Sequence, residues 1–269
     1  AEDCMTAPDP LRAHPAILVF LHLPRTGGTT LHEALSKHHA PDEICPMRLN
    51  RLEVLPPEDI ARYRFFSGHY RFEHVALTPT PRVTVTVLRE PRERVVSLWQ
   101  HWRRHWPSVT HKNEGVQLAQ ELGLRDFLRS DHLEVLEAFD NALARQLAGD
   151  CRARAPGVYT RWAWKDRAPL TEEEIVEAAC RNLSSFDLVG FTGALDPFHA
   201  AVCARMGWSG PAHLPRTNGH DQEVPGLYAV PDEPIPPETQ VELDRVTRLD
   251  RRVWDYALAR AGEEIVWTP

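Results

Sequence analysis

Residues Ala16 to Leu35 read AILVFLHLPRTGGTTLHEAL, and this stretch decides the fold. It opens with the apolar run 17–21, which is short and rich in β-formers and therefore predicts a buried strand. A turn follows over Pro24 to Thr30. After the turn, apolar residues recur from Leu31 at the i, i+3, i+4 spacing of one helix face. A strand, a glycine turn and a helix in this order predict an α/β fold.

The turn has the composition of an anion site. Backbone N–H groups and the positive end of the helix dipole converge at such a turn, which suits phosphate or sulfate. Its glycines let the backbone approach the anion, its arginine adds a fixed charge, and its threonine hydroxyls add donors. The alternative is an ordinary βα turn, which rarely concentrates these residue types. The predicted anion-binding residues are Arg25, Thr26, Gly27, Gly28, Thr29 and Thr30.

The same turn departs from the Walker A pattern G-x-x-x-x-G-K-[ST]. In that alignment His22 stands in place of the first glycine, and Gly28 stands in place of the lysine that reaches the β- and γ-phosphates. A nucleotide kinase or NTPase is therefore an alternative that lacks its central residue, whereas a phosphate cradle fits.

A second strand is predicted over 83–88, VTVTVL, and it leads into Arg89 and a helix from Arg92. An NTPase needs an acidic residue at such a strand end to hold magnesium, but this chain carries a cation there. We therefore expect a second anion pocket at Arg89, which Ser97 can reach from the helix.

A histidine follows another predicted strand. The segment 64–70, RFFSGHY, predicts a short strand that ends at Gly68 and His69, and open α/β sheets carry functional groups at the carboxyl ends of their strands. His69 is therefore a candidate functional residue; a hydrogen-bonded histidine near a turn is the alternative. A third clear strand is predicted over 186–191.

Composition limits the classes of protein. The chain has 269 residues and a net charge of −7, which argues against a general nucleic-acid binder and requires any anion to be held by a local arginine cluster. Its five cysteines form no CxxC pair, which favours free thiols in a reducing, cytoplasmic setting over a disulfide framework or zinc site. The polar first ten residues are unlike a signal peptide, and no apolar run approaches the roughly 18 residues of a membrane span.

The remaining segments follow from periodicity and from turn residues. We expect residues 1–15 to form a flexible arm and 16–269 to form a single domain. The HWRRH segment 101–105 is interpreted as an exposed basic helix end, and 156–169 as a loop. Helices are predicted over 58–63, 124–147, 171–182, 197–206 and 235–261, with a Thr171/Glu174 capping box at the start of the third.

These motifs together resemble the two nucleotide-binding signatures of sulfotransferases that use 3′-phosphoadenosine 5′-phosphosulfate (PAPS). The signatures are PRTGGTT after the first strand and LREPRERVVSLW after the second. The branch with heparan sulfate 2-O-sulfotransferase and bacterial carbohydrate and small-molecule sulfotransferases is the most similar. FSGHY, DNALARQLAG, DLVGFTGALD and LPRTN agree with it in order and spacing, so that the resemblance covers most of residues 16–260.

The resemblance implies a three-layer α/β/α fold like that of P-loop NTPases, with a central, mostly parallel sheet. It implies that PRTGGTT binds the 5′-phosphosulfate, with Arg25 in the place of the family's usual lysine at the bridging oxygen. Arg89 and Ser97 match the pair that holds the 3′-phosphate, and His69 matches the catalytic base.

Weaker correspondences complete the implied site. The segment 216–218 would add cofactor contacts, with Arg216 and Asn218 as the predicted ligands. Asn141 and Arg145 would face the acceptor, on the side formed by helices and loops around 100–170. Glu73 and His74 are spare candidates for the base.

The expected function is transfer of a sulfuryl group from PAPS to a hydroxyl of a small metabolite, lipid or glycan, leaving adenosine 3′,5′-bisphosphate (PAP). Sulfuryl transfer resembles phosphoryl transfer, in which positioning and electrostatics provide most of the catalysis, so that no metal is expected. A module that binds the nucleotide without catalysis is the non-enzymatic alternative.

Overall fold

The computed structural model describes residues 17–49, 51–161, 169–211, 213–215, 225–230 and 234–261. The flexible arm predicted for 1–15 lies outside these residues. Within the described ranges, every helix is either too short or too polar to cross a bilayer.

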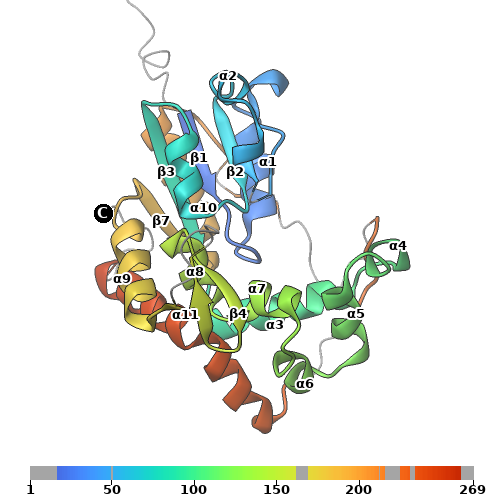
Figure 1. Cartoon of the computed structure of the whole chain (residues 1–269). Coiled ribbons are helices and arrows are strands. Elements are labelled where there is room, and N and C mark those ends of the chain that lie inside the picture. The colour runs from blue at the N-terminus through green and yellow to red at the C-terminus, as the bar shows by residue number, and fades with distance from the viewer. Residues whose placement is uncertain are drawn as a thin grey trace, which may run out of the picture.

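A four-stranded parallel sheet forms the centre of the molecule (Figure 1). Its order is β2-β1-β3-β7, so that β1 lies between two partners. Leu21, the last residue of β1, pairs with Gly68 of β2 and with Thr86 of β3. Every residue of β1 is buried, as expected for a parallel strand covered on both faces. The strands are β1 (Ile17–Leu21), β2 (Phe65–Gly68), β3 (Arg82–Leu88) and β7 (Leu188–Phe191).

Helices cover both faces of this sheet. Leu18 and Phe20 of β1 pack with α1 (Gly28–Ser36) and α10 (Leu195–Met206). The alternate residues of β1 pack against the other layer. That layer consists of α8 (Ala142–Ala148), α9 (Glu172–Leu183) and α11 (Gln240–Ala261). The α/β class and the parallel central sheet are thus confirmed, and the arrangement is consistent with three layers; the P-loop-like topology remains a prediction.

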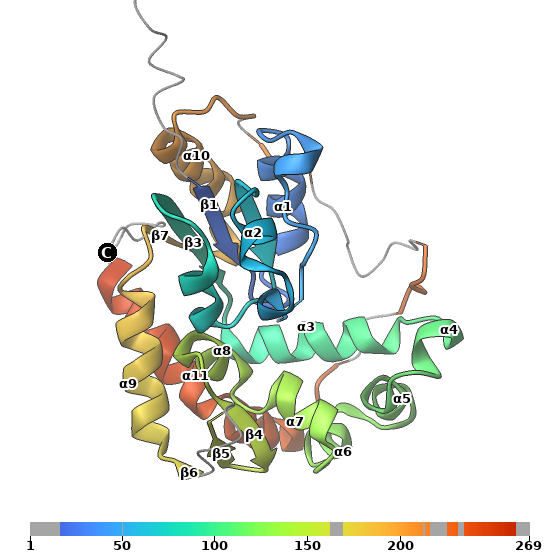
Figure 2. The same cartoon turned by 45° about the horizontal axis from the view of Figure 1, so that its top comes forward.

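A separate helical cluster stands beside the sheet. Figures 1 and 2 show α3 (Pro91–Arg103) running from the end of β3 toward α4 (Pro107–Thr110) and α5 (Glu114–Glu121). Apolar side chains of α3 pack there with those of α5, α6 (Leu124–Leu128), α7 (Leu133–Phe139) and the first turns of α11. The remaining short elements are α2 (Pro57–Ile60) and the 3₁₀ segments η2 (Pro41–Glu43), η3 (Leu52–Val54), η4 (Phe72–Leu77), η5 (Thr192–Ala194) and η6 (Pro237–Thr239).

Local signals placed several elements correctly. Thr171 caps α9 and forms the predicted capping box with Glu174. Gly149 follows the end of α8 as its C-cap. The segment 124–147 is largely helical, as predicted, and its helical residues are divided among α6, α7 and α8. A left-handed φ of 49° at Asn141 makes the last break.

The prediction of a loop over 156–169 was wrong in part. A small antiparallel sheet extends into this region: β4 (Arg152–Ala155) precedes it, β5 (Val158–Thr160) lies within it, and β6 (Pro169–Leu170) begins at its end. The part of the prediction that covers 162–168 lies outside the described residues. Gly157, with a φ of 70°, lies in the turn between β4 and β5. β5 and β6 are shorter than the four to eight residues over which hydrophobic alternation is recognised, and β4 only reaches the lower limit.

One buried carboxylate joins three helices. Asp250 of α11 is fully buried and lies 3.7 Å from the guanidinium of buried Arg94 in α3. It also accepts a hydrogen bond of 2.8 Å from the backbone N–H of Ala144, in the first turn of α8. The Asp250 carboxylate therefore balances the Arg94 charge and caps α8 at the same time.

We predict that Asp250→Ala lowers the free energy of unfolding by about 3–5 kcal/mol, because it leaves the Arg94 charge buried without its partner. Urea unfolding followed by circular dichroism measures the change. Asp255→Ala, at an exposed position on the same helix, is the matched control and should stay within about 0.5 kcal/mol of the unmodified chain. A loss as small as the control's would show that Asp250 does not join the helices.

Candidate active site

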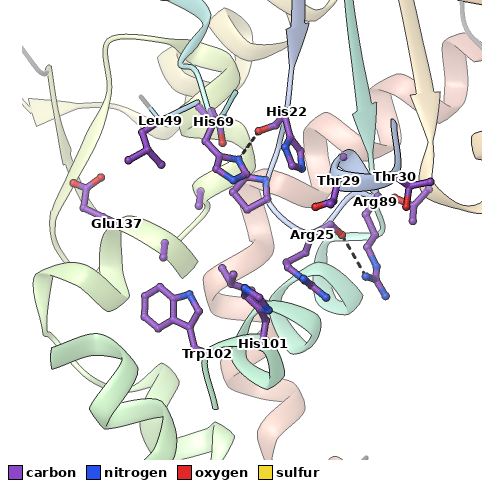
Figure 3. A pocket seen from close by; sticks show the side chains of 18 of the residues that line it. His22, Arg25, Thr29, Thr30, Leu49, His69, Arg89, His101, Trp102 and Glu137 are labelled. Atoms are coloured by element: carbon purple, nitrogen blue, oxygen red, sulfur yellow. Dashed lines mark hydrogen bonds between the residues drawn. The ribbon is translucent and has the colours of Figure 1, made fainter. Parts of the chain in front are cut away.

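A cavity of about 710 Å³ opens at the carboxyl ends of β1, β2 and β3 (Figure 3). The β1–α1 turn, His69 after β2 and Arg89 after β3 contribute to its wall. Side chains of α3, α7 and α8 form most of the rest, together with Leu49, Thr192 and Leu227. The cavity therefore lies where an open parallel sheet carries its functional groups.

The β1–α1 turn is held in a conformation that only a few residue types adopt readily. Arg25 and Gly27 both have left-handed backbones, with φ values of 67° and 83°. The hydroxyl of buried Thr26 donates a 2.8 Å hydrogen bond to the carbonyl of Leu23, which closes the turn. Thr26 is thus a structural residue of the turn and does not line the cavity, whereas Arg25, Gly27, Gly28, Thr29 and Thr30 do.

Gly28 is required because a histidine ring lies against it. A Cβ at Gly28 would come within 1.9 Å of the imidazole of His22. The His22 ring in turn stacks on Phe20 and tilts against His69, with centroid distances of 5.5 and 4.4 Å. The first residue of α1 can therefore come close to the end of β1 only as glycine.

Two arginines from different strand ends meet at this turn. The guanidinium of Arg89 donates a 3.3 Å hydrogen bond to the backbone carbonyl of Arg25, and the Nε of Arg25 donates one of 3.1 Å to the hydroxyl of Ser97. Arg89 also reaches Glu93 at 3.5 Å. Among the described residues, no carboxylate forms an ion pair with Arg25.

The field at Arg25 is strongly positive. Burial, and then the nearby charges of Arg89 and Arg104, lower the pKa of Arg25 to about 10. Arg25 stays protonated at neutral pH, and its charge would be better satisfied by an anion in the cavity. The protein as a whole carries a net charge of −7, so this cationic cluster is a local feature.

His69 is held in one tautomer. Its Nδ1 lies 2.9 Å from the carbonyl oxygen of His22, and a carbonyl only accepts, so Nδ1 carries the proton and Nε2 keeps a lone pair. Burial lowers the pKa of His69, with a partial opposing effect of the His22 carbonyl and a further lowering by Arg48. A neutral imidazole with a free lone pair at a cavity wall is suited to accept a proton.

The spare base candidates are elsewhere. Glu73 accepts a hydrogen bond from Arg71. His74 contacts Arg71 and lies 2.9 Å from a carboxylate oxygen of Glu53. Neither Glu73 nor His74 lines the cavity.

Asn141 and Arg145 lie behind the cavity wall. The Asn141 amide donates to Asp140 and to the Tyr159 hydroxyl, and its oxygen accepts from the backbone of Leu249. Both side chains are buried, and Arg145 donates to main-chain carbonyls of α7 and of the junction between α7 and α8. These polar groups fix that junction, and neither residue lines the cavity. The predicted ligands Arg216 and Asn218 lie outside the described residues.

The opposite wall comes largely from the end of α3 and the residues just after it, and the sequence interpretation had assigned this segment, 101–105, to an exposed surface. That interpretation was wrong: His101, Trp102 and His105 line the cavity, and Arg104 is only 1% exposed. Figure 3 shows His101 and Trp102 facing Arg25 and His69. Ser97 was already a candidate, and His101 and His105 follow it at intervals of four residues. Residues at this spacing share one helix face, so the spacing could have indicated that both histidines face the cavity.

Two helices contribute polar residues to the remaining wall, Glu137 from α7 and Gln146 from α8. Glu137 is the one carboxylate among the described residues that line the cavity, and it pairs with Arg145 at 3.1 Å. Arg89 also borders a neighbouring groove of about 440 Å³ that includes Ser97. The two hollows share Arg89.

The comparisons with known proteins agree with part of this interpretation. The chain is 34% identical over 86 residues to a protein-tyrosine sulfotransferase of Arabidopsis thaliana. The match covers 31% of this chain and only 17% of the plant protein. No family model matches the chain. The similarity supports a sulfotransferase relationship in general terms, but it does not support the branch with heparan sulfate 2-O-sulfotransferase that the motifs suggested.

We predict that Gly28→Ala destabilises the protein by about 1–3 kcal/mol, because the new methyl group forces His22 away from the turn. Chemical unfolding measures this. Gly193→Ala is the control, since a Cβ there meets no atom within 4 Å. Equal stability of the two variants would contradict the close packing of His22 on the turn.

Proposed function

We propose that the chain transfers a sulfuryl group from PAPS to the hydroxyl of an acceptor. The observation that carries this proposal is the cavity in which Arg25 and Arg89, from neighbouring strand ends, lie beside the neutral imidazole of His69. The partial similarity to a sulfotransferase supports the reaction class.

In this proposal the 5′-phosphosulfate binds at the β1–α1 turn. The backbone N–H groups at the start of α1 and the hydroxyls of Thr29 and Thr30 donate to its oxygens. The 3′-phosphate binds at Arg89, which borders both hollows, with Ser97 beside it. The adenosine then runs from the turn toward the neighbouring groove, and no carboxylate is required at either phosphate.

The chemistry follows from these positions. The acceptor oxygen attacks the sulfur in line. The bond between the acceptor oxygen and sulfur forms while the bond from sulfur to the bridging oxygen breaks. PAP then leaves with the negative charge. Nε2 of His69 takes the proton of the acceptor hydroxyl. Arg25 stabilises the charge that develops on the bridging oxygen, an effect that is stronger in the transition state than in the ground state.

The acceptor occupies the part of the cavity near α3. Apolar and aromatic surface from Leu49 and Trp102 lies there with the polar groups of His101 and Gln146. A mixed wall of this kind suits a hydroxylated metabolite, a lipid, a glycan or, following the name of the plant protein, a tyrosine side chain. Screening of such acceptors with labelled PAPS would identify the class. Magnesium-dependent ATP hydrolysis in place of sulfuryl transfer would support the NTPase alternative.

We predict that Arg89→Ala weakens PAP binding by about 10- to 100-fold, the loss expected for a hydrogen-bonded charge pair. Isothermal titration calorimetry measures the affinity. Arg62→Ala removes an arginine whose side chain is 71% exposed, and this control should bind PAP normally. An unchanged affinity in Arg89→Ala would remove Arg89 from the nucleotide site.

We predict that His69→Ala lowers kcat by about 10²–10⁴ and leaves PAP affinity intact, because the ring acts on the acceptor proton. In the unmodified enzyme the base must be unprotonated, so kcat/KM, which reports the pKa of the free enzyme, falls as the pH decreases through that pKa. Burial lowers that pKa, which places the acid limb below 6.5.

The pH profile and one control variant complete this test. Glu73→Gln should keep both the rate and the acid limb. An acid limb that persists in His69→Ala with an unchanged rate would assign the base to another residue.

A further inference from the structure

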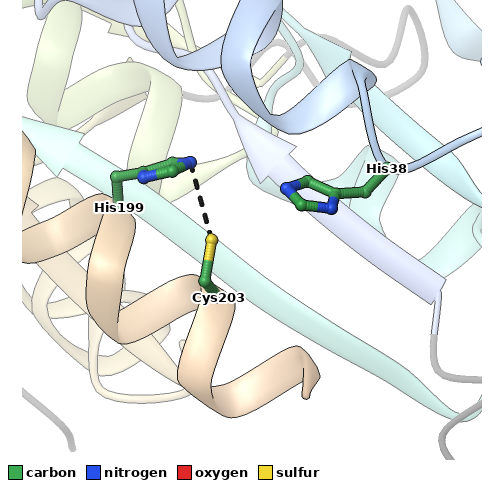
Figure 4. Close-up of side chains that lie close together, drawn as sticks. All are labelled: His38, His199 and Cys203. Carbon is green, nitrogen blue, oxygen red and sulfur yellow. Dashed lines mark hydrogen bonds between the residues drawn. The ribbon is translucent and has the colours of Figure 1, made fainter. Parts of the chain in front are cut away.

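Three side chains with metal-binding atoms meet away from the proposed active site. His199 and Cys203 lie one turn apart on α10, and His38 follows the end of α1 (Figure 4). A nitrogen of each histidine and the sulfur of Cys203 all lie within 4.8 Å of one another. Figure 4 shows the three side chains converging on one space between α10 and the end of α1.

The imidazole of His199 has no strong partner in this space. Its side chain is completely buried, and its Nδ1 has no hydrogen-bond partner among the described residues. Within the part of the chain that the structure describes, its Nε2 meets only the sulfur of Cys203, at 3.5 Å, and sulfur is a weak hydrogen-bond partner. A buried polar ring without good partners costs free energy, and a bound ion is one of the few arrangements that explains it.

The distances fit a small tetrahedral site. Metal–nitrogen bonds of about 2.0–2.1 Å and a metal–sulfur bond of about 2.3 Å place neighbouring ligand atoms roughly 3.3–3.6 Å apart. The 3.5 Å separation between His199 and Cys203 already has this value. His38 is partly buried, so a shift of about 1 Å in its ring brings the third ligand into place.

Neighbouring residues shape the site. The indole of Trp208 stacks on the His38 ring at a centroid distance of 4.4 Å and an angle of 7°, which orients the ring. The backbone of Gly210 closes the other side: a Cβ there would come within 2.7 Å of the His199 ring and 2.9 Å of the Cys203 sulfur. His38 is the partly exposed member of the three, so a water molecule can reach the ion from its side and supply a fourth ligand.

We propose that His38, His199 and Cys203 bind one borderline-soft transition-metal ion, with Zn²⁺ as the ion that the ligand set fits best. Thiolate and imidazole select such ions over magnesium and calcium, and the thiol proton is released to solvent on binding. The carbonyl end of α1 favours a cation at this position. The ion fastens the C-terminal end of α1 to α10.

This inference is independent of the proposed sulfuryl transfer. The absence of a CxxC pair favoured free thiols over a zinc site in the sequence analysis. A ligand set drawn from residues 38, 199 and 203 has no CxxC signature, so cysteine spacing alone does not reveal it. The bound ion would hold in place the helix whose other end forms the proposed phosphate cradle.

The test uses the full chain, stripped with a chelator and dialysed against Zn²⁺, with bound metal measured by mass spectrometry. We expect one zinc per chain and a higher thermal midpoint with zinc than without it. Substitution with Co²⁺ should give the charge-transfer band of a thiolate ligand. Cys203→Ser and His38→Ala should each lose stoichiometric binding and the zinc-dependent rise of the midpoint.

Matched controls remove one cysteine and one histidine that do not belong to the cluster. Cys180→Ser, on α9, and His213→Ala, whose side chain is 88% exposed, should bind zinc as the unmodified chain does. Absence of zinc from the unmodified chain, retention of zinc in both ligand variants, or a cobalt spectrum without the thiolate band would each overturn the proposal. If Cys203→Ser does not fold, His38→Ala decides, because its position is partly exposed.

Discussion

The parallel pairing of β1 with β2 on one side and with β3 on the other is the constraint from which the candidate site follows. Leu21 is in register with Gly68 and Thr86. The Leu21 carbonyl accepts a hydrogen bond of 2.8 Å from the Thr86 hydroxyl. The backbone N–H of the next residue, His22, donates a hydrogen bond of 2.9 Å to the Gly68 carbonyl. β1 and β2 therefore end at one level, and β3 ends close by, at Leu88. The residues that follow them have to share one space, although they are far apart in the sequence.

That shared space concentrates positive charge. Strand ends in a parallel sheet commonly lead into helix N-termini, whose N–H groups already favour anions. Here two arginines are added, and no described carboxylate pairs with Arg25. The repulsion between Arg25 and Arg89 is a cost in the free protein, which an anion bound between them would remove. We interpret this arrangement as preorganisation for a ligand with two anionic groups.

His22 has a central role that the sequence did not indicate. Its ring packs on Gly28, its backbone N–H extends the pairing with β2, and its carbonyl fixes the tautomer of His69. Burial holds the pKa of His22 well below its usual value, so the ring remains neutral beside the cations. One residue thus joins the turn, the sheet and the candidate base.

Much of the fold was predictable from local patterns. The strands at β1 and β3, the glycine turn and the capped start of α9 all have sequence signatures that act over a few residues. Arg25, His69 and Arg89 were predictable as one site because parallel strands bring their carboxyl ends together.

The errors have a common cause in long-range packing. Asn141 and Arg145 match a motif, but their environment is set by the contacts of Asn141 with Tyr159 and Leu249, which are distant in the sequence. His101 and Arg104 look like surface residues until the opposite cavity wall and the segment 225–230 are placed beside α3. The helical spacing from Ser97 could have indicated the position of His101, but no local period reports the contacts of Arg104 or Asn141.

A crystal structure of the chain with bound PAP would test the central claim most directly. The account predicts the 5′-phosphate at the backbone N–H groups of Gly28 and Thr29, the 3′-phosphate within hydrogen-bond distance of the Arg89 guanidinium, and Nε2 of His69 facing the site of the missing sulfuryl group. Nucleotide density elsewhere, or a nucleotide whose 3′-phosphate has no contact with Arg89, would contradict it.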